Sequence, residues 1–135
     1  MKRVIIVEDE TAAVVNLRSM LAAVAGDIEV VAVLESVEEA VEYFLEKPSA
    51  DIVFMDIHLA DGDSFRIFDR VNIDIPIIFT TAYDEYALKA FKVNSIDYLL
   101  KPYKEEDLRR ALDKLQRLTT AERLERQKSR EQVVA

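Results

Sequence analysis

The stretch DIVFMDIHLADGD, residues 51–63, decides the fold, because a short apolar run ends in a carboxylate and a turn sequence follows at once. The run at 51–55 contains Ile, Val, Phe and Met. It predicts a strand that is buried on both faces, as in a parallel sheet. One aspartate after a strand means little, because loops are polar. The meaning of Asp56 therefore depends on what the other strands deliver to the same place.

Four other short apolar runs have the same character and are predicted as strands, at 3–7, 28–34, 75–80 and 96–100. Segments with the helical spacing of apolar residues follow the five runs, at 10–25, 37–47, 64–71, 84–93 and from near Lys104. Strands that alternate with helices in this way predict successive right-handed βαβ units. The expected fold is α/β, a (βα)5 five-stranded parallel sheet in a doubly wound, flavodoxin-like three-layer sandwich.

The composition fits one globular domain, because 135 residues can form a real core but not two ordinary ones. The absence of cysteine excludes disulfides, thiolate metal sites and cysteine nucleophiles. No apolar run approaches the roughly 20 residues that cross a bilayer. The N-terminus is too short and too acidic for a signal peptide. We expect a cytoplasmic protein without a membrane span.

The charge is distributed unevenly. Residues 1–100 carry 8 Lys and Arg against 19 Asp and Glu, a net charge of −11, whereas residues 101–135 have a net charge of +3. Such an acidic body is poorly suited to follow a phosphate backbone. From Thr119 the chain becomes charge-rich and only sparsely apolar. We expect a domain at 1–118 and, at 119–135, a helical extension or linker toward an output domain that is absent from this chain.

The carboxyl ends of parallel strands meet at one edge of a sheet, where sites form. The residues that the predicted strands bring to this edge are Glu8, Asp9, Glu10, Asp56, Thr80, Thr81, Lys101 and Pro102. Clustered carboxylates repel each other unless a cation intervenes, and a hard, oxygen-liking ion such as Mg²⁺ suits them. A carboxylate beside Mg²⁺ and a lysine can attack phosphorus and form an acyl phosphate.

Four motifs carry a family resemblance: VEDE (7–10), FMDIHLADGDSF (54–65), FTTA (79–82) and DYLLKPY (97–103). With them, residues 1 to about 118 resemble the receiver domain of bacterial two-component response regulators. The string at 77–103 looks like receivers attached to LytTR (LytR/AlgR)-type DNA-binding domains. The resemblance implies a phosphorelay switch that uses Mg²⁺, a sensor histidine kinase as partner, and a homodimer on activation. It also implies transcription control through a missing DNA-binding domain, and no conventional enzyme activity beyond help with its own phosphorylation and dephosphorylation.

The resemblance also implies a role for each site residue. Asp56 would be the phosphoacceptor, while Lys101 and Thr81 would bind the phosphoryl group. The metal ligands would be Glu8, Asp9, Asp56 and the backbone carbonyl of His58. Thr81 and Tyr98 would be the switch residues, and the Lys101–Pro102 peptide would be cis. Glu8 departs from the family pattern, in which Asp is commoner at this position. Without the resemblance, spacing alone does not choose between Thr80 and Thr81, and Tyr98 would be assigned to the core.

A charged stretch of mixed sign offers a possible dimer face, made of Lys89, Lys92, Asp97, Asp107 and Arg109. An isologous dimer could use such a face, and a solvated surface is the equal alternative. Two other residues of the turn, Asp61 and Asp63, are predicted to be solvated and capping, with Asp63 at the start of the short helix near Ser64. Gly62 is predicted to provide a positive φ in the same turn.

Three other functions compete with the switch. A phosphatase of the haloacid-dehalogenase type needs a second aspartate two residues after the first, and this chain has His58 there. A nucleotide or flavin module needs a glycine- or hydroxyl-rich loop after the first strand, and the sequence EDET would repel phosphate. A pseudo-receiver would dimerise without phosphorylation, which the intact set of site residues disfavours. The His58 ring has no His or Cys partner for a transition metal.

Overall fold

A five-stranded parallel sheet with the order β2-β1-β3-β6-β7 forms the centre of the computed structural model, which describes residues 2–83 and 95–117. Its strands are β1 (Lys2–Val7), β2 (Ile28–Leu34), β3 (Ile52–Asp56), β6 (Ile77–Thr81) and β7 (Ser95–Leu100). All neighbouring strands in this sheet pair in parallel. The order reverses direction on either side of β1, as in a doubly wound fold. The predicted fold class is confirmed.

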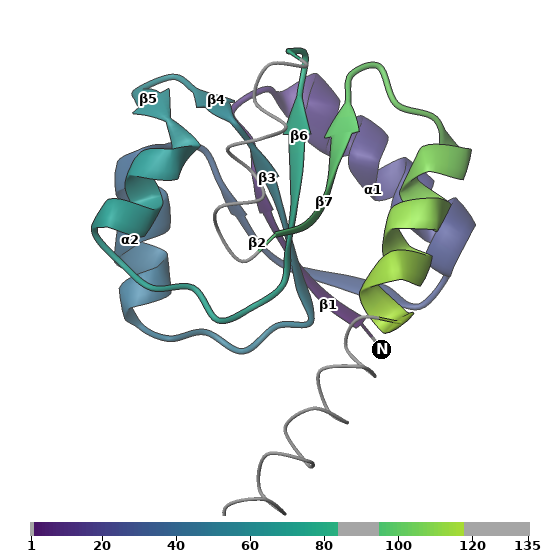
Figure 1. The fold of residues 1–135 in the computed structure, drawn as a ribbon, viewed down its shortest axis with the longest axis horizontal. Coiled ribbons are helices and arrows are strands. Elements are labelled where there is room, and N and C mark those ends of the chain that lie inside the picture. Colours follow the sequence, from purple (N-terminus) through teal and green to yellow (C-terminus); the bar gives the residue numbers. More distant parts are fainter. Residues whose placement is uncertain (1, 84–94, 118–135) are drawn as a thin grey trace, which may run out of the picture.

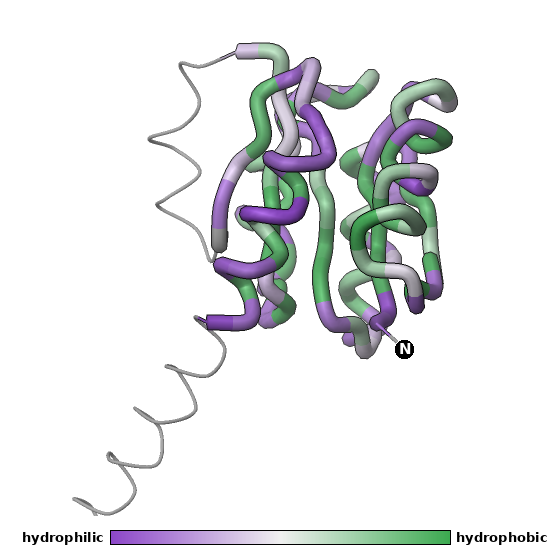
Figure 2. The backbone as a smooth tube through the Cα atoms, turned by 90° about the vertical axis from the view of Figure 1, so that its right-hand side faces the viewer, coloured by the Kyte–Doolittle hydropathy of each residue, from purple (hydrophilic) through white to green (hydrophobic). Residues whose placement is uncertain are grey.

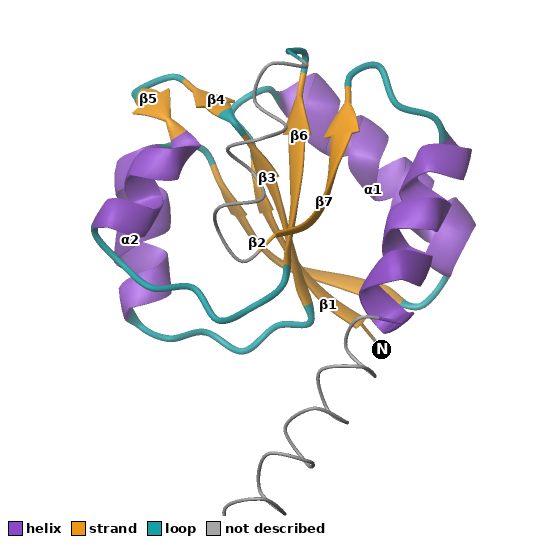
Figure 3. Cartoon of the chain, in the orientation of Figure 1, coloured by secondary structure: helices purple, strands orange, loops and turns teal. Residues whose placement is uncertain are grey.

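Helices cover both faces of this sheet (Figures 1 and 3). The helical elements are α1 (Thr11–Ala25), α2 (Val37–Leu45), the 3-10 helix η1 (Ser64–Asp69) and a helix at 105–117. Figure 1 shows α2 on one side and α1 with the helix at 105–117 on the other. The helix expected at 84–93 and the extension expected at 119–135 lie outside the described residues. None of the described helices has the length and apolar character that a bilayer crossing requires.

The strands alternate their side chains between two buried clusters, one on each face of the sheet. The cluster on the α2 face includes Val53, Met55 and Phe79. The cluster on the α1 face includes Phe54 and Ile78. Because both faces are apolar, the strands read as continuous hydrophobic runs in the sequence. Figure 2 shows the strands coloured mainly as hydrophobic.

A short antiparallel hairpin, which the sequence did not predict, follows β3 and consists of β4 (His58–Leu59) and β5 (Gly62–Asp63). Its turn has a φ of 140° at Gly62, where a side chain would be strained, so the predicted positive φ is confirmed. Asp63 Oδ1 accepts a hydrogen bond of 2.8 Å from the Phe65 amide and caps η1, as predicted. The turn therefore gives the residues after Asp56 a fixed path.

Ser64 is expected to be a destabilising residue. It is fully buried, and in residues 2–83 and 95–117 its hydroxyl is the buried side-chain polar atom that lacks a hydrogen-bond partner. Replacing it in Ser64→Ala should raise the free energy of unfolding by about 1 kcal/mol, because the cost of desolvating the hydroxyl disappears. Urea unfolding followed by circular dichroism measures this change.

A second serine provides the matched control. Ser36 Oγ accepts a hydrogen bond of 3.0 Å from the Glu39 amide at the start of α2. Ser36→Ala should therefore lower the free energy of unfolding by about 1 kcal/mol, the usual cost of losing an N-cap. A loss of stability in both variants would show that the Ser64 hydroxyl has a favourable partner.

Candidate functional site

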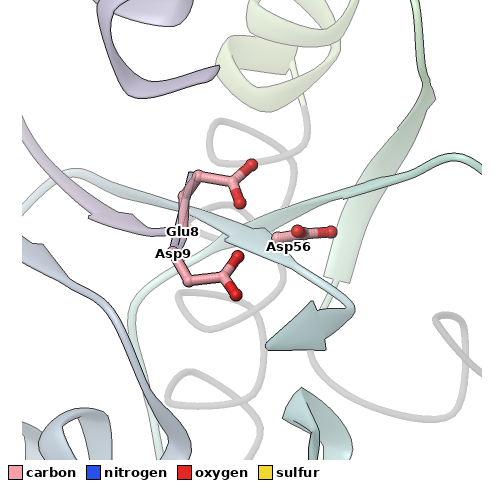
Figure 4. Close-up of side chains that lie close together, drawn as sticks. All are labelled: Glu8, Asp9 and Asp56. Atoms are coloured by element: carbon pink, nitrogen blue, oxygen red, sulfur yellow. The ribbon is translucent and has the colours of Figure 1, made fainter. Parts of the chain in front are cut away.

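Three carboxylates meet at the carboxyl edge of the sheet. Glu8 and Asp9 follow β1, and Asp56 ends β3. Val7 pairs with Met55, so the next residues of the two strands stand at the same level. The carboxylate oxygens of all three residues lie within 4.8 Å of one another, and Figure 4 shows them side by side. The convergence that the strand ends predict is therefore present.

Lys101 brings a positive charge to these carboxylates. Its Nζ donates a hydrogen bond of 2.8 Å to Glu8 Oε1 and lies 3.5 Å from Asp56 Oδ2. The Lys101 amide donates to the Thr81 carbonyl at 2.7 Å, which fixes the backbone beside β6. The peptide to Pro102 is cis, the isomer that the resemblance implies. A single ammonium group thus spans two buried carboxylates.

Burial and charge shift the pKa values of this pair. Burial raises the pKa of Glu8; the hydrogen bond from Lys101 opposes this shift and the neighbouring Asp56 adds to it. The pKa of Lys101 is raised: burial alone would lower it, but the hydrogen bond to Glu8 and the charge of Asp56 outweigh burial. Lys101 is therefore fully charged at neutral pH, while the charged form of Glu8 is held at an energetic cost.

The two threonines at the end of β6 face opposite sides. Side chains alternate along a strand, so Thr80 shares the α1 face with Ile78, and Thr81 shares the α2 face with Phe79. Both threonines are buried. Thr81 Oγ1 accepts a hydrogen bond of 3.0 Å from the Tyr83 amide. The structure brings both threonines to the carboxyl edge, so their position at this edge does not by itself choose between them.

His58 lies beside the carboxylates, with an exposed side chain. Its amide donates a long hydrogen bond of 3.4 Å to Asp56 Oδ1. Its ring packs edge-on against the Tyr83 ring, with 5.0 Å between the ring centroids. The rings of these two residues thus connect the loop after β3 with the loop after β6.

Comparison with known proteins identifies the family. The family profile described as "Response regulator receiver domain" matches residues 4–113. The chain belongs to this family. It is 38% identical over 117 residues to the sensory transduction protein LytT of Bacillus anthracis, covering 84% of this chain and 47% of that protein. It is 40% identical over 114 residues to LytT of Enterococcus faecalis, covering 82% and 46%.

A solved structure agrees with this assignment. The response regulatory domain of protein mrkE from Klebsiella pneumoniae superposes with a TM-score of 0.70 at 33% identity, covering 88% of this chain and 96% of that one. The chain spans about half the length of the curated relatives that it matches. The family and the fold are thus established together, and the molecule is a receiver domain of the two-component type.

Part of the dimer face that the sequence predicts lies beside β7. Asp97, Asp107 and Arg110 line one surface hollow together with residues of β7. Asp107 pairs with Arg110 at 2.8 Å, and its other carboxylate oxygen accepts from the Lys104 amide at 2.9 Å. Arg109 lines a different hollow, beside the end of α1. Arg109 and Arg110 thus line different hollows, and the dimer face predicted from the sequence, Arg109 included, stays a prediction.

Two further members of the predicted dimer face and the predicted switch residue Tyr98 have separate outcomes. Lys89 and Lys92 lie outside the described residues. Tyr98 is half-buried and packs against the cluster on the α2 face. Its amide donates to Asp97 Oδ1 at 2.8 Å. This position is compatible with the core role and the switch role alike.

Asp61 makes a contact that the sequence did not reveal. Its Oδ1 and Oδ2 accept hydrogen bonds of 2.8 and 3.2 Å from the amides of Val37 and Glu38. These amides lie in the first turn of α2, where backbone donors have no partner within the helix itself. The carboxylate thus ties the loop after Asp56 to a helix 24 residues earlier in the chain. No local pattern could have signalled this contact, because it depends on the packing of two distant segments.

Replacing this cap in Asp61→Ala should lower the free energy of unfolding by about 1 kcal/mol at pH 7. The hydrogen bond from the Val37 amide lowers the pKa of Asp61 below its ordinary value of 3.8. A depressed carboxyl pKa contributes stability that is present above the unfolded-state value and is lost as the pH falls through the folded-state value. The difference between wild type and variant should therefore begin to shrink as the pH falls toward about 4 and should vanish once the pH is below the lowered folded-state pKa.

Amide hydrogen exchange and urea unfolding at several pH values measure this effect. The control is Asp63→Ala, which removes the cap of η1 from the same turn. Exchange at Val37 and Glu38 should accelerate in Asp61→Ala and stay unchanged in Asp63→Ala. Equal acceleration in both variants would mean that the whole turn, rather than Asp61, holds α2.

Proposed function

We propose that this receiver domain is a phosphorylation-controlled switch and that Asp56 accepts the phosphoryl group from a sensor histidine kinase. The observation that carries the proposal is the position of Asp56: it is buried, 3.5 Å from the Lys101 ammonium and next to two further carboxylates. An isolated acidic rim would not place a half-buried cation against buried carboxylates.

The reaction is a displacement at phosphorus. A carboxylate oxygen of Asp56 attacks the phosphorus of a phosphohistidine, and an oxygen–phosphorus bond forms as the phosphorus–nitrogen bond breaks. The imidazole leaves with the electron pair and takes a proton from solvent. Lys101 faces the phosphoryl oxygens and stabilises the negative charge on them. The product is an acyl phosphate on Asp56, and the domain assists its formation and hydrolysis without being a conventional enzyme.

The donor set fits Mg²⁺, because Glu8, Asp9 and Asp56 offer hard oxygen ligands within 4.8 Å of one another. The backbone carbonyl of His58 would complete the protein ligands. Bound there, the ion would neutralise the carboxylates and hold phosphoryl oxygens. Burial raises the pKa of Glu8 and the neighbouring Asp56 adds to the shift, and an ion at this place would offset both effects by favouring the charged carboxylates.

Phosphorylation adds nearly two negative charges at one point. In our proposal, the Thr81 hydroxyl then leaves the Tyr83 amide for the phosphoryl oxygens, and Tyr98 turns toward the space it vacates. The predicted face that includes Asp97, Asp107 and Arg109 pairs with its counterpart in a homodimer. Control of transcription would follow through a C-terminal DNA-binding domain, with 1–118 as the receiver and 119–135 as the linker. The cell compartment that fits this role is the cytoplasm.

Intact mass spectrometry tests the switch. The protein is incubated with phosphoramidate, a small phosphodonor, with Mg²⁺ or with a chelator. We expect one phosphoryl adduct that requires Mg²⁺ and is removed by hydroxylamine, which cleaves acyl phosphates, and we expect the phosphorylated protein to sediment as a dimer. An adduct that resists hydroxylamine would be a phosphoester on a hydroxyl. No adduct at all would favour a receiver that dimerises without phosphorylation.

A further inference from the structure

Thr80 is placed with the phosphoacceptor by the strand register. Asp56 of β3 pairs directly with Thr80 of β6. Paired residues of neighbouring parallel strands point to the same face of a sheet, with their strands about 4.8 Å apart. Phe54 and Ile78, two residues earlier in each strand, both belong to the cluster on the α1 face. The side chains of Asp56 and Thr80 are therefore neighbours on that face.

Thr80 also lies on the path of Lys101. In the sheet, β6 stands between β3 and β7. Lys101 follows β7, yet its Nζ reaches Asp56 and Glu8 on the far side of β6. Its side chain therefore passes the carboxyl end of β6, the end at which Thr80 lies. Thr80 is 4% exposed and is one of the few buried polar residues in the described part of the chain.

Thr81, in contrast, does not share this position. Alternation directs it to the α2 face, and its hydroxyl is bound to the Tyr83 amide. The threonine that stands level with Asp56, on the same face of the sheet, is Thr80. A buried threonine in a strand can be a simple core residue, since its methyl group packs well there. Because Thr80 is in register with the buried Asp56, its hydroxyl could also contact a group that is bound to Asp56.

We propose that Thr80 is a second hydroxyl of the phosphoryl site, which donates a hydrogen bond to a phosphoryl oxygen on Asp56. The inference rests on the proposed function of Asp56 and adds a binding residue to it. A hydroxyl can donate one hydrogen bond, and a bond to a charged oxygen is about twice as strong as a neutral one. Thr80 stabilises the phosphorylated state from the α1 face of the sheet, and this effect does not require Thr81 to move.

The test measures binding of beryllium fluoride, a phosphoryl mimic, by NMR titration in the presence of Mg²⁺. Thr80→Val keeps the shape of the side chain and removes the hydroxyl, whereas Thr80→Ser keeps the hydroxyl and removes the methyl group. We expect binding to weaken about tenfold in Thr80→Val, the effect of losing one hydrogen bond to a charged group, and to stay within about twofold of wild type in Thr80→Ser. Urea unfolding checks that both variants fold.

The outcomes separate the inference from the proposed function. Wild-type affinity in Thr80→Val, or equal weakening in both variants, would overturn the role of the hydroxyl and leave Asp56 as the phosphoacceptor. If wild-type protein does not bind beryllium fluoride and takes no phosphoryl adduct, the proposed function fails and the inference fails with it. Weakening confined to Thr80→Val supports the inference.

Discussion

Asp56→Asn is expected to abolish the phosphoryl adduct and to make the protein more stable than wild type in the absence of Mg²⁺. The amide lacks the nucleophilic charge, so no acyl phosphate can form. The gain in stability has a separate cause, because Asp56 is buried beside Glu8 and raises the pKa of that carboxyl. Removing one of the clustered charges should raise the free energy of unfolding by about 1 kcal/mol at pH 7, the repulsion between two like charges about 4 Å apart in a medium like water.

Intact mass and urea unfolding, each with and without Mg²⁺, measure both effects. Mg²⁺ should stabilise wild type through binding to the folded state and stabilise Asp56→Asn much less. The matched control is Asp63→Asn in the same loop, which should keep the adduct. An adduct on Asp56→Asn would place phosphorylation on another residue. Lower stability without Mg²⁺ would show that Asp56 mainly holds Lys101 in place, rather than adding to the repulsion.

Asp56→Asn is expected to lose the phosphoryl adduct and to gain stability, and both effects follow from the way the sheet is built. Apolar residues on both faces of β1, β3 and β6 make the strands recognisable in the sequence, and parallel strands must end at one edge. The meeting of Glu8, Asp9 and Asp56 could therefore be predicted from strand ends alone. The cost of that meeting could not, because it depends on how deeply each carboxylate is buried.

Other features of the site depend on packing between distant segments. The capping of α2 by Asp61 joins residues 24 positions apart, and no local pattern carries it. The side of β6 that Thr80 faces depends on the register between β3 and β6, which a one-residue shift would reverse. The sequence placed the lysine at the correct edge, but not its preference for Glu8 at 2.8 Å over Asp56 at 3.5 Å.

That preference makes Lys101→Met the second large prediction. The variant keeps an unbranched side chain, one atom shorter than that of lysine, and leaves Glu8 and Asp56 buried without their cation. The free energy of unfolding at pH 7 should fall by about 3 kcal/mol, the lower end of the cost of breaking a buried pair, because the lysine side chain is 25% exposed. Phosphorylation should also slow, because the phosphoryl oxygens lose a positive partner.

The pH dependence of this loss identifies its origin. The folded-state pKa of Lys101 is raised above 10.5, so its contribution is complete below that value and is lost only as the pH rises through the folded-state pKa. Glu8 has a raised pKa already, and without Lys101 that pKa should rise further. Protonation of Glu8 in mild acid should therefore restore part of the stability of Lys101→Met.

Urea unfolding from pH 5 to 8, with and without Mg²⁺, measures this recovery, and Lys101→Arg is the control that keeps the charge. Mg²⁺ should stabilise Lys101→Met more than Lys101→Arg, because the ion supplies the missing positive charge at the same carboxylates. If the loss of unfolding free energy in Lys101→Met stays constant with pH and Mg²⁺, it comes from the packing of the lysine stem and not from its charge. A deficit that both treatments reduce would show that Lys101 and the metal ion neutralise the same charges, so that Lys101 is free to turn to the phosphoryl group once the ion is bound.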